Sequence, residues 1–146
     1  MRFETRAVHA GGKPDPATGA VAPPIHLATT FEHGPAAETP LGYMYIRDGN
    51  PTQARLEEAL AAVEGGETAL AFASGMAAAA AYLQAQPAGS HVVYPSDVYY
   101  GVRALAREFL PRWGMEATAV DTTDLGAVRA ALRPNTRVVW AETPSN

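Results

Sequence analysis

The sequence predicts an α/β domain with a mostly parallel sheet, preceded by an extended N-terminal arm. From residue 68 to residue 141, short apolar segments alternate with segments of helical periodicity. Strands that alternate with helices form β-α units with right-handed crossovers and a mostly parallel sheet. Residues 1–50 are instead interrupted throughout by glycine and proline, a pattern that favours an extended arm over an independent core.

The individual elements follow in chain order. The first clear helix begins at Pro51, with Asn50 as its N-cap, and ends at Gly65. It carries an apolar face at Leu56, Ala59, Leu60 and Val63. Four further strands are expected, over 68–72 (buried), 91–94, 115–120 and 137–141. Three further helices are expected, over 76–86, 102–112 and 124–132. The second of these helices has residues 105, 106, 109 and 110 on one side, and the third is capped by Thr122 or Thr123. In the arm, Pro24 argues against a central strand over 25–31.

Composition narrows the class of protein. The 146 residues, 47% of them hydrophobic, suit one domain with a sizeable core. The net charge is −4 and the 11 basic residues form no stripe, which argues against a nucleic-acid partner. No cysteine is present, which excludes disulfides and fits the cytoplasm. The N-terminus has no signal-peptide pattern and the apolar run over 76–83 is too short to span a bilayer, so we expect a soluble cytoplasmic protein without membrane contact.

The stretch over residues 67–83 contains the clearest candidate binding feature. A predicted strand is followed by Ser74 and Gly75, and an alanine-rich helix starts at Met76. The first turn of a helix has unpaired N–H groups and a dipole that favours anions. We therefore expect the N–H groups of Gly75 and Met76 to face a phosphate. An ordinary connection between a strand and a helix packed closely on a sheet also fits these residues.

Two further stretches carry candidate ligand contacts. Tyr45 and Arg47 alternate in a segment predicted to be extended, so a phenol and a guanidinium point the same way, which suits a phosphate clamp. A solvated arginine beside a tyrosine that covers the core is the alternative. Tyr99 and Tyr100 follow a strand, where an aromatic ring can stack on a planar ligand or simply pack at a helix start.

Several familiar motifs are absent from the sequence. It contains no phosphate-binding loop, no dinucleotide fingerprint and no G-x-S-x-G elbow. The four histidines lie at no metal-ligand spacing, so no metal site is predicted, and His91 in a strand is interpreted as structural.

Five motifs occur together in a fixed order: P-P-I-H, Y-I-R-D-G-N-P-T, S-G-M-A-A, Y-Y-G and E-T-P-S-N. This ordered set resembles the N-terminal part of the Cys/Met-metabolism, or transsulfuration, family of enzymes that use pyridoxal phosphate. The resemblance implies an aminotransferase-like (fold type I) large domain over residues 51–146, truncated, with an arm over residues 1–50 that contacts a neighbouring subunit. It also implies a small-molecule amino-acid substrate and a homo-oligomer, a homotetramer built as a dimer of dimers.

The resemblance also implies roles for particular residues. Gly75 and Met76 would bind the cofactor phosphate, and Tyr45 and Arg47 would reach it from a neighbouring subunit. Tyr100 would stack on the pyridine ring and assist proton transfer, which makes it the one catalytic residue predicted here. A separate pair lies at the end of the sequence: Asn146 would sit near the ring's phenolic oxygen, with Glu142 supporting its loop.

The resemblance leaves the reaction open. Lys13 is the only lysine and does not match the family's Schiff-base motif, so we expect this chain to be inactive alone and to continue past Asn146 in a longer protein. We predict a lyase or transferase of the cystathionine γ-synthase or γ-lyase type. Val102, where methionine γ-lyases carry cysteine, counts against that member. Alternatives are an O-acetylhomoserine sulfhydrylase, a cystathionine β-lyase, or a non-catalytic phosphate-binding and assembly module.

Overall fold

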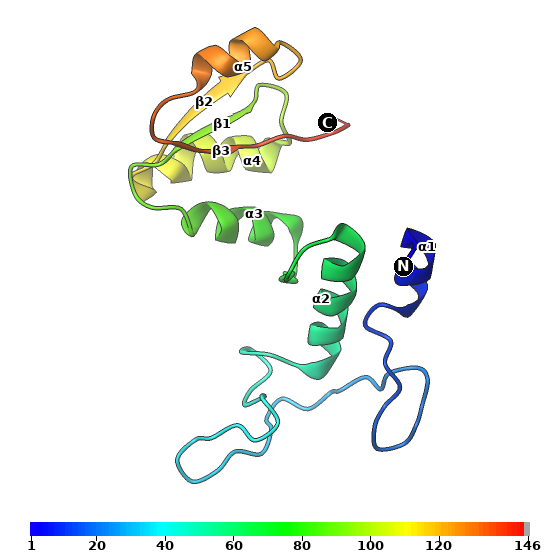
Figure 1. Ribbon diagram of the computed structural model, residues 1–146. Coiled ribbons are helices and arrows are strands. Elements are labelled where there is room, and N and C mark those ends of the chain that lie inside the picture. The colour runs from blue at the N-terminus through cyan, green and yellow to red at the C-terminus, as the bar shows by residue number, and fades with distance from the viewer. Residues whose placement is uncertain (145–146) are drawn as a thin grey trace. The chain divides into compact units, whose positions relative to one another are not determined.

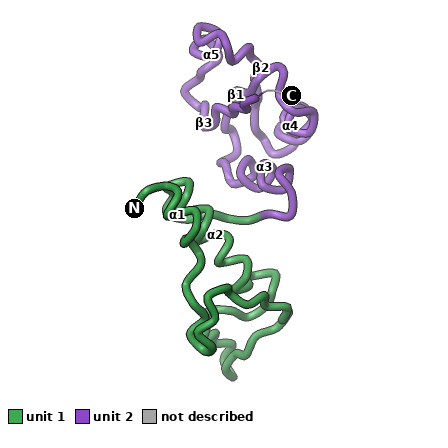
Figure 2. The backbone as a smooth tube through the Cα atoms, turned by 90° about the vertical axis from the view of Figure 1, so that its right-hand side faces the viewer, with its two compact units in different colours: residues 1–71 green, residues 72–146 purple. Residues whose placement is uncertain are grey.

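The computed structural model describes residues 1–144 and divides the chain into two compact units, residues 1–71 and residues 72–146 (Figure 1; Figure 2). The first unit contains helices α1 (Phe3–His9) and α2 (Pro51–Glu64). The second contains helix α3 (Gly75–Gln84), strand β1 (His91–Pro95), helix α4 (Tyr100–Ala104), a π-helical turn η1 (Leu105–Phe109), a 3-10 turn η2 (Leu110–Trp113), strand β2 (Glu116–Val120), helix α5 (Leu125–Ala131) and strand β3 (Thr136–Val139).

The second unit confirms the predicted parallel sheet. Its three strands lie in the order β2-β1-β3, and β1 runs parallel to both neighbours. The last pairing continues past β3, because the Trp140 N–H donates to the Val93 carbonyl at 2.8 Å. Both crossovers pass through helices, so the carboxyl ends of all three strands meet at one edge of the sheet.

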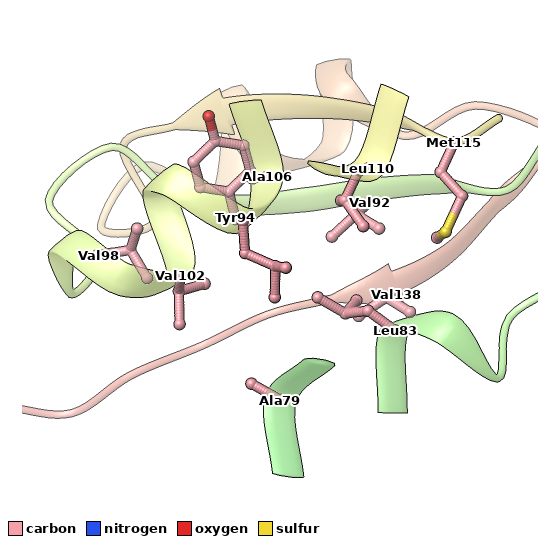
Figure 3. Close-up of a cluster of buried hydrophobic side chains, with 11 residues drawn as sticks. Ala79, Leu83, Val92, Tyr94, Val98, Val102, Ala106, Leu110, Met115 and Val138 are labelled. Carbon is pink, nitrogen blue, oxygen red and sulfur yellow. The ribbon is translucent and has the colours of Figure 1, made fainter. Parts of the chain in front are cut away.

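The core lies between the sheet and the helices α3 and α4, as Figure 3 shows. Alternate residues of β1 point to opposite faces, so Val92 and Tyr94 enter this cluster while His91 and Val93 face the other side of the sheet. The cluster comprises Ala79, Leu83, Val92, Tyr94, Val98, Val102, Leu105, Ala106, Leu110, Met115 and Val138. Helix α5 packs on β2.

One predicted strand is wrong. Residues 68–72 form no strand, and Leu70 and Phe72 are 75% and 45% exposed. A strand exists only where a neighbour pairs with its backbone groups, and none of the strands in residues 1–144 pairs with this segment. The Ala71 N–H instead donates to the Glu57 carboxylate at 2.8 Å.

Two helices differ in detail from the prediction. The helix expected over 102–112 begins at Tyr100 and passes from α to π to 3-10 geometry. Pro111 has no N–H and so cannot continue the regular pattern, and Phe109 is exposed rather than buried with its neighbours. The cap of α5 is Asp124, which accepts from the Gly126 and Ala127 N–H groups. The predicted cap Thr123 is wrong because its hydroxyl donates to Asp121, and no cap contact at α5 involves Thr122.

The predicted start and end of α2 are confirmed. The Asn50 side chain accepts from the Thr52 N–H at 2.8 Å, and Gly65 ends the helix with a left-handed φ of 73°. Asn50 also donates to the His26 carbonyl, and the Thr52 hydroxyl accepts from the His26 N–H. These contacts join the P-P-I-H segment to the helix start. Residues 25–31 contain no strand beyond one antiparallel bridge between Thr30 and Tyr45, as Pro24 predicted.

The first unit exposes its apolar residues. Among residues 1–71, Ala61 is the one buried hydrophobic residue. The predicted apolar face of α2 is only partly covered, since Leu56 and Leu60 are exposed while Ala59 and Val63 are half-buried. The exposed large hydrophobic side chains of this unit are Met1, Phe3, Val8, Val21, Ile25, Leu27, Leu41, Ile46, Leu56, Leu60 and Leu70. Across residues 1–144, no helix combines the length and the apolar composition needed to cross a bilayer.

Candidate functional site

The start of helix α3 leaves two backbone donors free. The Ser74 hydroxyl accepts from the Ala77 N–H at 3.1 Å, and the Ser74 carbonyl accepts from the Ala78 N–H. Within residues 1–144, the N–H groups of Gly75 and Met76 have no hydrogen-bond partner. The helix start predicted at this position is confirmed, and two adjacent free donors at a helix N-terminus suit an anion.

Gly75 stands in open space. A Cβ built at this residue meets no atom within 4 Å, and its φ lies outside the left-handed region. Neither packing within the described chain nor backbone strain therefore requires glycine here. Close approach of a ligand to the backbone would be a sufficient reason for a glycine, which has no side chain, at position 75.

A pocket of about 480 Å³ opens at this helix start. Its volume lies within the range of small-molecule sites, about 300–1,000 Å³. Its walls come from α3, from the start of α4 and from the segment after β3, at the carboxyl ends of parallel strands where ligands of α/β sheets bind. The lining residues are Ser74, Gly75, Met76, Ala79, Tyr99, Val102, Trp140 and Glu142.

The tyrosine that lines the pocket is Tyr99. Tyr100, the residue singled out from the sequence, is the first residue of α4; it is not among the lining residues and its side chain is 67% exposed. The Arg103 guanidinium lies 5.9 Å from the centroid of the Tyr100 ring. The sequence places both tyrosines after β1 but does not determine which of them turns toward the pocket.

Glu142 joins two walls of the pocket. One carboxylate oxygen accepts from the Trp140 indole N–H at 2.9 Å, and the other accepts from the Tyr99 backbone N–H at 3.1 Å. Trp140 was not predicted as a site residue. The signal that could have found it is its place directly after the last strand, where pocket residues are expected.

Gly101 permits the close packing of α3 against α4 beside the pocket. A Cβ at this position would lie 2.7 Å from Cε1 of Tyr99 and 2.8 Å from Sδ of Met76. Both of these side chains line the pocket. Gly101 therefore sets how near the aromatic wall approaches the helix start.

Tyr45 and Arg47 lie together in the first unit. The Arg47 guanidinium carbon is 4.2 Å from the centroid of the Tyr45 ring. The predicted extended segment is wrong beyond Tyr45, because residues 46–48 form a turn in which the Asp48 and Gly49 N–H groups both donate to the Tyr45 carbonyl. The turn still places the Arg47 guanidinium against the Tyr45 ring, although the extended alternation from which their common direction was predicted is absent. Their role toward a phosphate stays a prediction.

Of the other residues discussed from the sequence, those that the structure describes do not line the pocket described above. Lys13 is 86% exposed and pairs with Glu58 at 3.7 Å, in the first unit. Asn146 lies outside the described residues. Within residues 1–144, no group of three or more His, Cys, Asp or Glu side chains could hold a metal ion.

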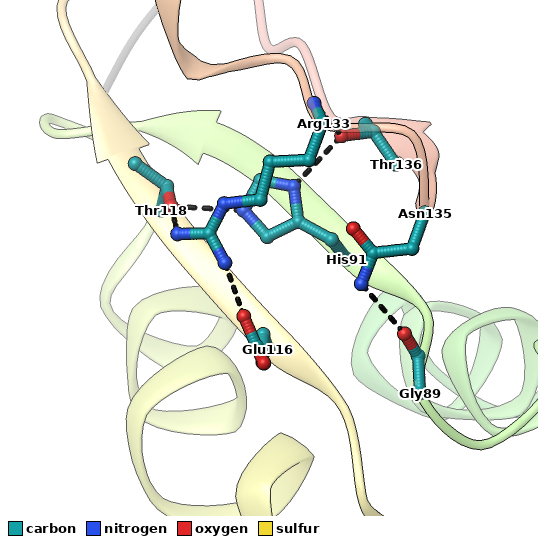
Figure 4. A network of polar contacts seen from close by, with 7 residues as sticks. All are labelled: Gly89, His91, Glu116, Thr118, Arg133, Asn135 and Thr136. Carbon is teal, nitrogen blue, oxygen red and sulfur yellow. Dashed lines mark hydrogen bonds and ion pairs between the residues drawn. The ribbon is translucent and has the colours of Figure 1, made fainter.

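His91 is a structural residue, as predicted from its place in a strand. It is fully buried, and its Nδ1 and Nε2 atoms lie 2.8 Å from the Thr136 and Thr118 hydroxyls (Figure 4). Arg133 pairs with Glu116 and donates to the Thr118 hydroxyl at 3.3 Å. Burial first, and the Arg133 guanidinium second, lower the pKa of His91, while Glu116 opposes this shift.

Comparison with known proteins assigns the chain to a family. The sequence model described as "Cys/Met metabolism PLP-dependent enzyme" matches residues 4–146. The chain belongs to this family, which confirms the resemblance drawn from the ordered motifs. The family uses pyridoxal phosphate (PLP), so the comparison supports this cofactor.

Individual relatives share substantial identity with the chain. It is 50% identical over 143 residues to a cystathionine gamma-synthase from Mycobacterium bovis, and this match covers 97% of the chain and 37% of the relative. It is 46% identical to a cystathionine beta-lyase from Bacillus subtilis, over 99% of the chain and 37% of the relative. A crystal structure of cystathionine gamma-lyase from Lactobacillus plantarum superposes with a TM-score of 0.89 at 42% identity, over 99% of the chain and 38% of that structure. The chain thus spans less than two fifths of these proteins.

The pocket has the donors that the family's cofactor needs at its phosphate end. The two free N–H groups at the start of α3 suit a phosphate. The open Cβ position of Gly75 allows close approach, and Tyr99 and Trp140 supply aromatic surface for a planar ring. These residues fit the group.

Proposed function

We propose that the full-length protein is a PLP-dependent transsulfuration enzyme of the cystathionine γ-synthase or γ-lyase type. Its substrate would be a sulfur amino acid or an activated homoserine. The observation that carries this proposal is the pocket at the carboxyl ends of the parallel strands, where two free backbone donors of α3 lie beside aromatic side chains. We also propose a cytoplasmic homo-oligomer, built as a dimer of dimers.

Different residues of the pocket would contact different parts of the cofactor. Gly75 and Met76 would donate their N–H groups to the phosphate, where the helix dipole adds a favourable field. When bound, pyridoxal phosphate supplies the electron sink for the chemistry on the amino acid. The pocket's other walls, Ala79 and Val102, are apolar and would keep water from the ring.

The aromatic partner of the ring follows from the pocket's geometry. Tyr99 lines the pocket and has its backbone held by Glu142, whereas Tyr100 is more exposed and lies outside the lining. Geometry therefore favours Tyr99 for the stacking role that the sequence pattern suggested for Tyr100. Replacing each tyrosine by leucine in turn separates them, because the variant that lacks the stacking residue loses more cofactor affinity.

Tyr45 and Arg47 would act on the phosphate of a neighbouring subunit. The support is the first unit's composition: it buries one hydrophobic residue and exposes eleven large ones, a surface that a second subunit would cover. In a two-fold dimer such a unit is exchanged reciprocally between subunits.

A second candidate reaction is that of a cystathionine β-lyase, favoured by the 46% identity to the Bacillus subtilis protein of that name. Incubating the purified full-length protein with cystathionine, and separately with an activated homoserine plus cysteine, distinguishes the candidates. Formation of cystathionine supports a cystathionine γ-synthase, and cleavage of cystathionine supports a lyase. Which carbon–sulfur bond breaks then separates the γ-lyase from the β-lyase.

The phosphate site is tested by Gly75→Val in the full-length protein. The new side chain enters open space within the described chain, so folding stability should change by no more than about 0.5 kcal/mol. It would stand where the ligand approaches, so the dissociation constant of pyridoxal phosphate should rise about tenfold or more. Ala77→Ser, on the exposed side of the same helix turn, is the control. Unchanged cofactor affinity in Gly75→Val would remove the phosphate from this helix start.

A further inference from the structure

The carboxylate of Glu142 makes two hydrogen bonds to groups far apart in the chain. Trp140 follows strand β3 and Tyr99 precedes helix α4, and one carboxylate oxygen serves each. Hydrogen bonds to an ionised acceptor are roughly twice as strong as those between neutral groups. Beyond the pairing of β1 with β3, this side chain therefore ties the residue after β3 to the loop that follows β1.

The backbone N–H of Tyr99 has few other hydrogen-bond acceptors within reach. This residue lies between β1 and α4, where the backbone has left the sheet and the helix has not begun. The neighbouring Val98 N–H donates to the Pro95 carbonyl, and the Tyr99 carbonyl accepts from the Arg103 N–H. Glu142 thus supplies the acceptor that holds the backbone of Tyr99 in place.

All three bonded residues line the same pocket. Tyr99, Trp140 and Glu142 face it together with Gly75 and Met76. The carboxylate is therefore placed to set where both aromatic rings stand relative to the free donors of α3. Its negative charge by itself would disfavour an anion at those donors, so its position is explained by geometry rather than by attraction to a phosphate.

We propose that Glu142 is a positioning residue that fixes Tyr99 and Trp140 as the aromatic wall of the cofactor pocket. It acts through these two residues and not on the reacting atoms. The inference rests on the proposed function, because it assumes that a planar, phosphate-bearing ligand occupies the pocket.

The test uses the full-length protein labelled with fluorotryptophan. The fluorine resonance of Trp140 is assigned by its loss in Trp140→Phe. Glu142→Gln keeps the side-chain shape, but its amide can accept only through one oxygen and presents donors to the other N–H. We expect the Trp140 resonance to shift and broaden, and the dissociation constant of pyridoxal phosphate to rise about tenfold, because the displaced aromatic wall loses contact with the ring.

Two further measurements separate positioning from charge and from general stability. The apoprotein's affinity for inorganic phosphate should stay equal or improve in Glu142→Gln, because a negative charge is lost beside the donors. Glu142→Asp keeps the charge but is too short to serve both donors, so its Trp140 resonance and its affinity for pyridoxal phosphate should change as in Glu142→Gln, while its affinity for inorganic phosphate should stay that of the unsubstituted protein. Glu108→Gln, an exposed glutamate of the same unit, is the control and should change none of these values.

The possible outcomes distinguish this inference from the proposed function. If pyridoxal phosphate does not perturb the Trp140 resonance of the unsubstituted protein, the proposed site is wrong and the inference falls with it. If it does, and Glu142→Gln leaves the resonance and the affinity unchanged, the positioning role alone is overturned. A Glu142→Asp variant that matches the unsubstituted protein would likewise show that charge suffices.

Discussion

Replacement of Gly101 by valine should damage both the folding stability and the pocket. A Cβ here would lie 2.7 Å from Cε1 of Tyr99 and 2.8 Å from Sδ of Met76. Ordinary contacts between such atoms are about 3.5–4.0 Å, so each of the two side chains must move away by about 1 Å. Both side chains line the pocket, and their retreat would change its shape.

The expected size of the effect follows from this overlap. Overpacking of a core costs about 1–3 kcal/mol, but the atoms met here are the ends of the Met76 and Tyr99 side chains, and Tyr99 is half-exposed and can move. We therefore expect the free energy of unfolding of the full-length apoprotein to fall by about 1 kcal/mol, the low end of that range, measured by denaturant titration. The dissociation constant of pyridoxal phosphate, measured by absorbance, should rise about tenfold or more.

Two companion variants make the reasoning refutable. Gly75→Val introduces the same side chain into open space and should weaken the cofactor without lowering stability. Met76→Ala should relieve part of the Gly101→Val penalty, so that the two substitutions couple by about 0.5–3 kcal/mol. Unchanged stability and affinity in Gly101→Val, or strict additivity with Met76→Ala, would show that the close approach seen here is not the constraint.

Three further predictions concern single groups. Because burial lowers the pKa of His91, the unfolded chain binds more protons than the folded chain below about pH 6.5. The free energy of unfolding should therefore be highest above that pH and should fall as the pH drops toward the folded-state pKa, by up to about 1.4 kcal/mol per pH unit. Denaturant titrations from about pH 7.5 to 5.5 should show a weaker pH dependence of this free energy in His91→Gln, and equal dependences would contradict the reasoning. Lys13→Met should leave the cofactor's visible absorbance unchanged, since this amine is exposed and paired with Glu58; a lost absorbance band together with a borohydride adduct on Lys13 in the unsubstituted protein would refute this. Arg47→Ala and Gly75→Val subunits, assayed at a pyridoxal phosphate concentration at which each variant alone is nearly inactive, should regain about a quarter of the sites when unfolded, mixed equally and refolded, if the clamp acts across subunits. No recovery in mixed dimers confirmed by mass would place Arg47 at its own chain's site.

The parts of the fold that depend on local chemistry could be read from the sequence. Asn50, Pro51 and Gly65 bound α2 because caps and helix stops act within a few residues of themselves. The parallel sheet follows from the alternation of strands and helices. The expected strand over 68–72 failed because a strand needs a neighbour, which no local pattern supplies.

For the site, the sequence by itself determined the free helix start at Gly75 and Met76, because an N-terminus exposes its donors wherever a helix begins. It also placed two tyrosines directly after a strand. Only the tertiary structure decided that Tyr99 rather than Tyr100 lines the pocket, and that Trp140 and Glu142 complete it. These residues come from segments some forty positions apart, and their meeting depends on the register of β1 against β3 and on the packing of α3 against α4. Such distances are set by long-range pairing and close packing, which no single stretch of the chain encodes.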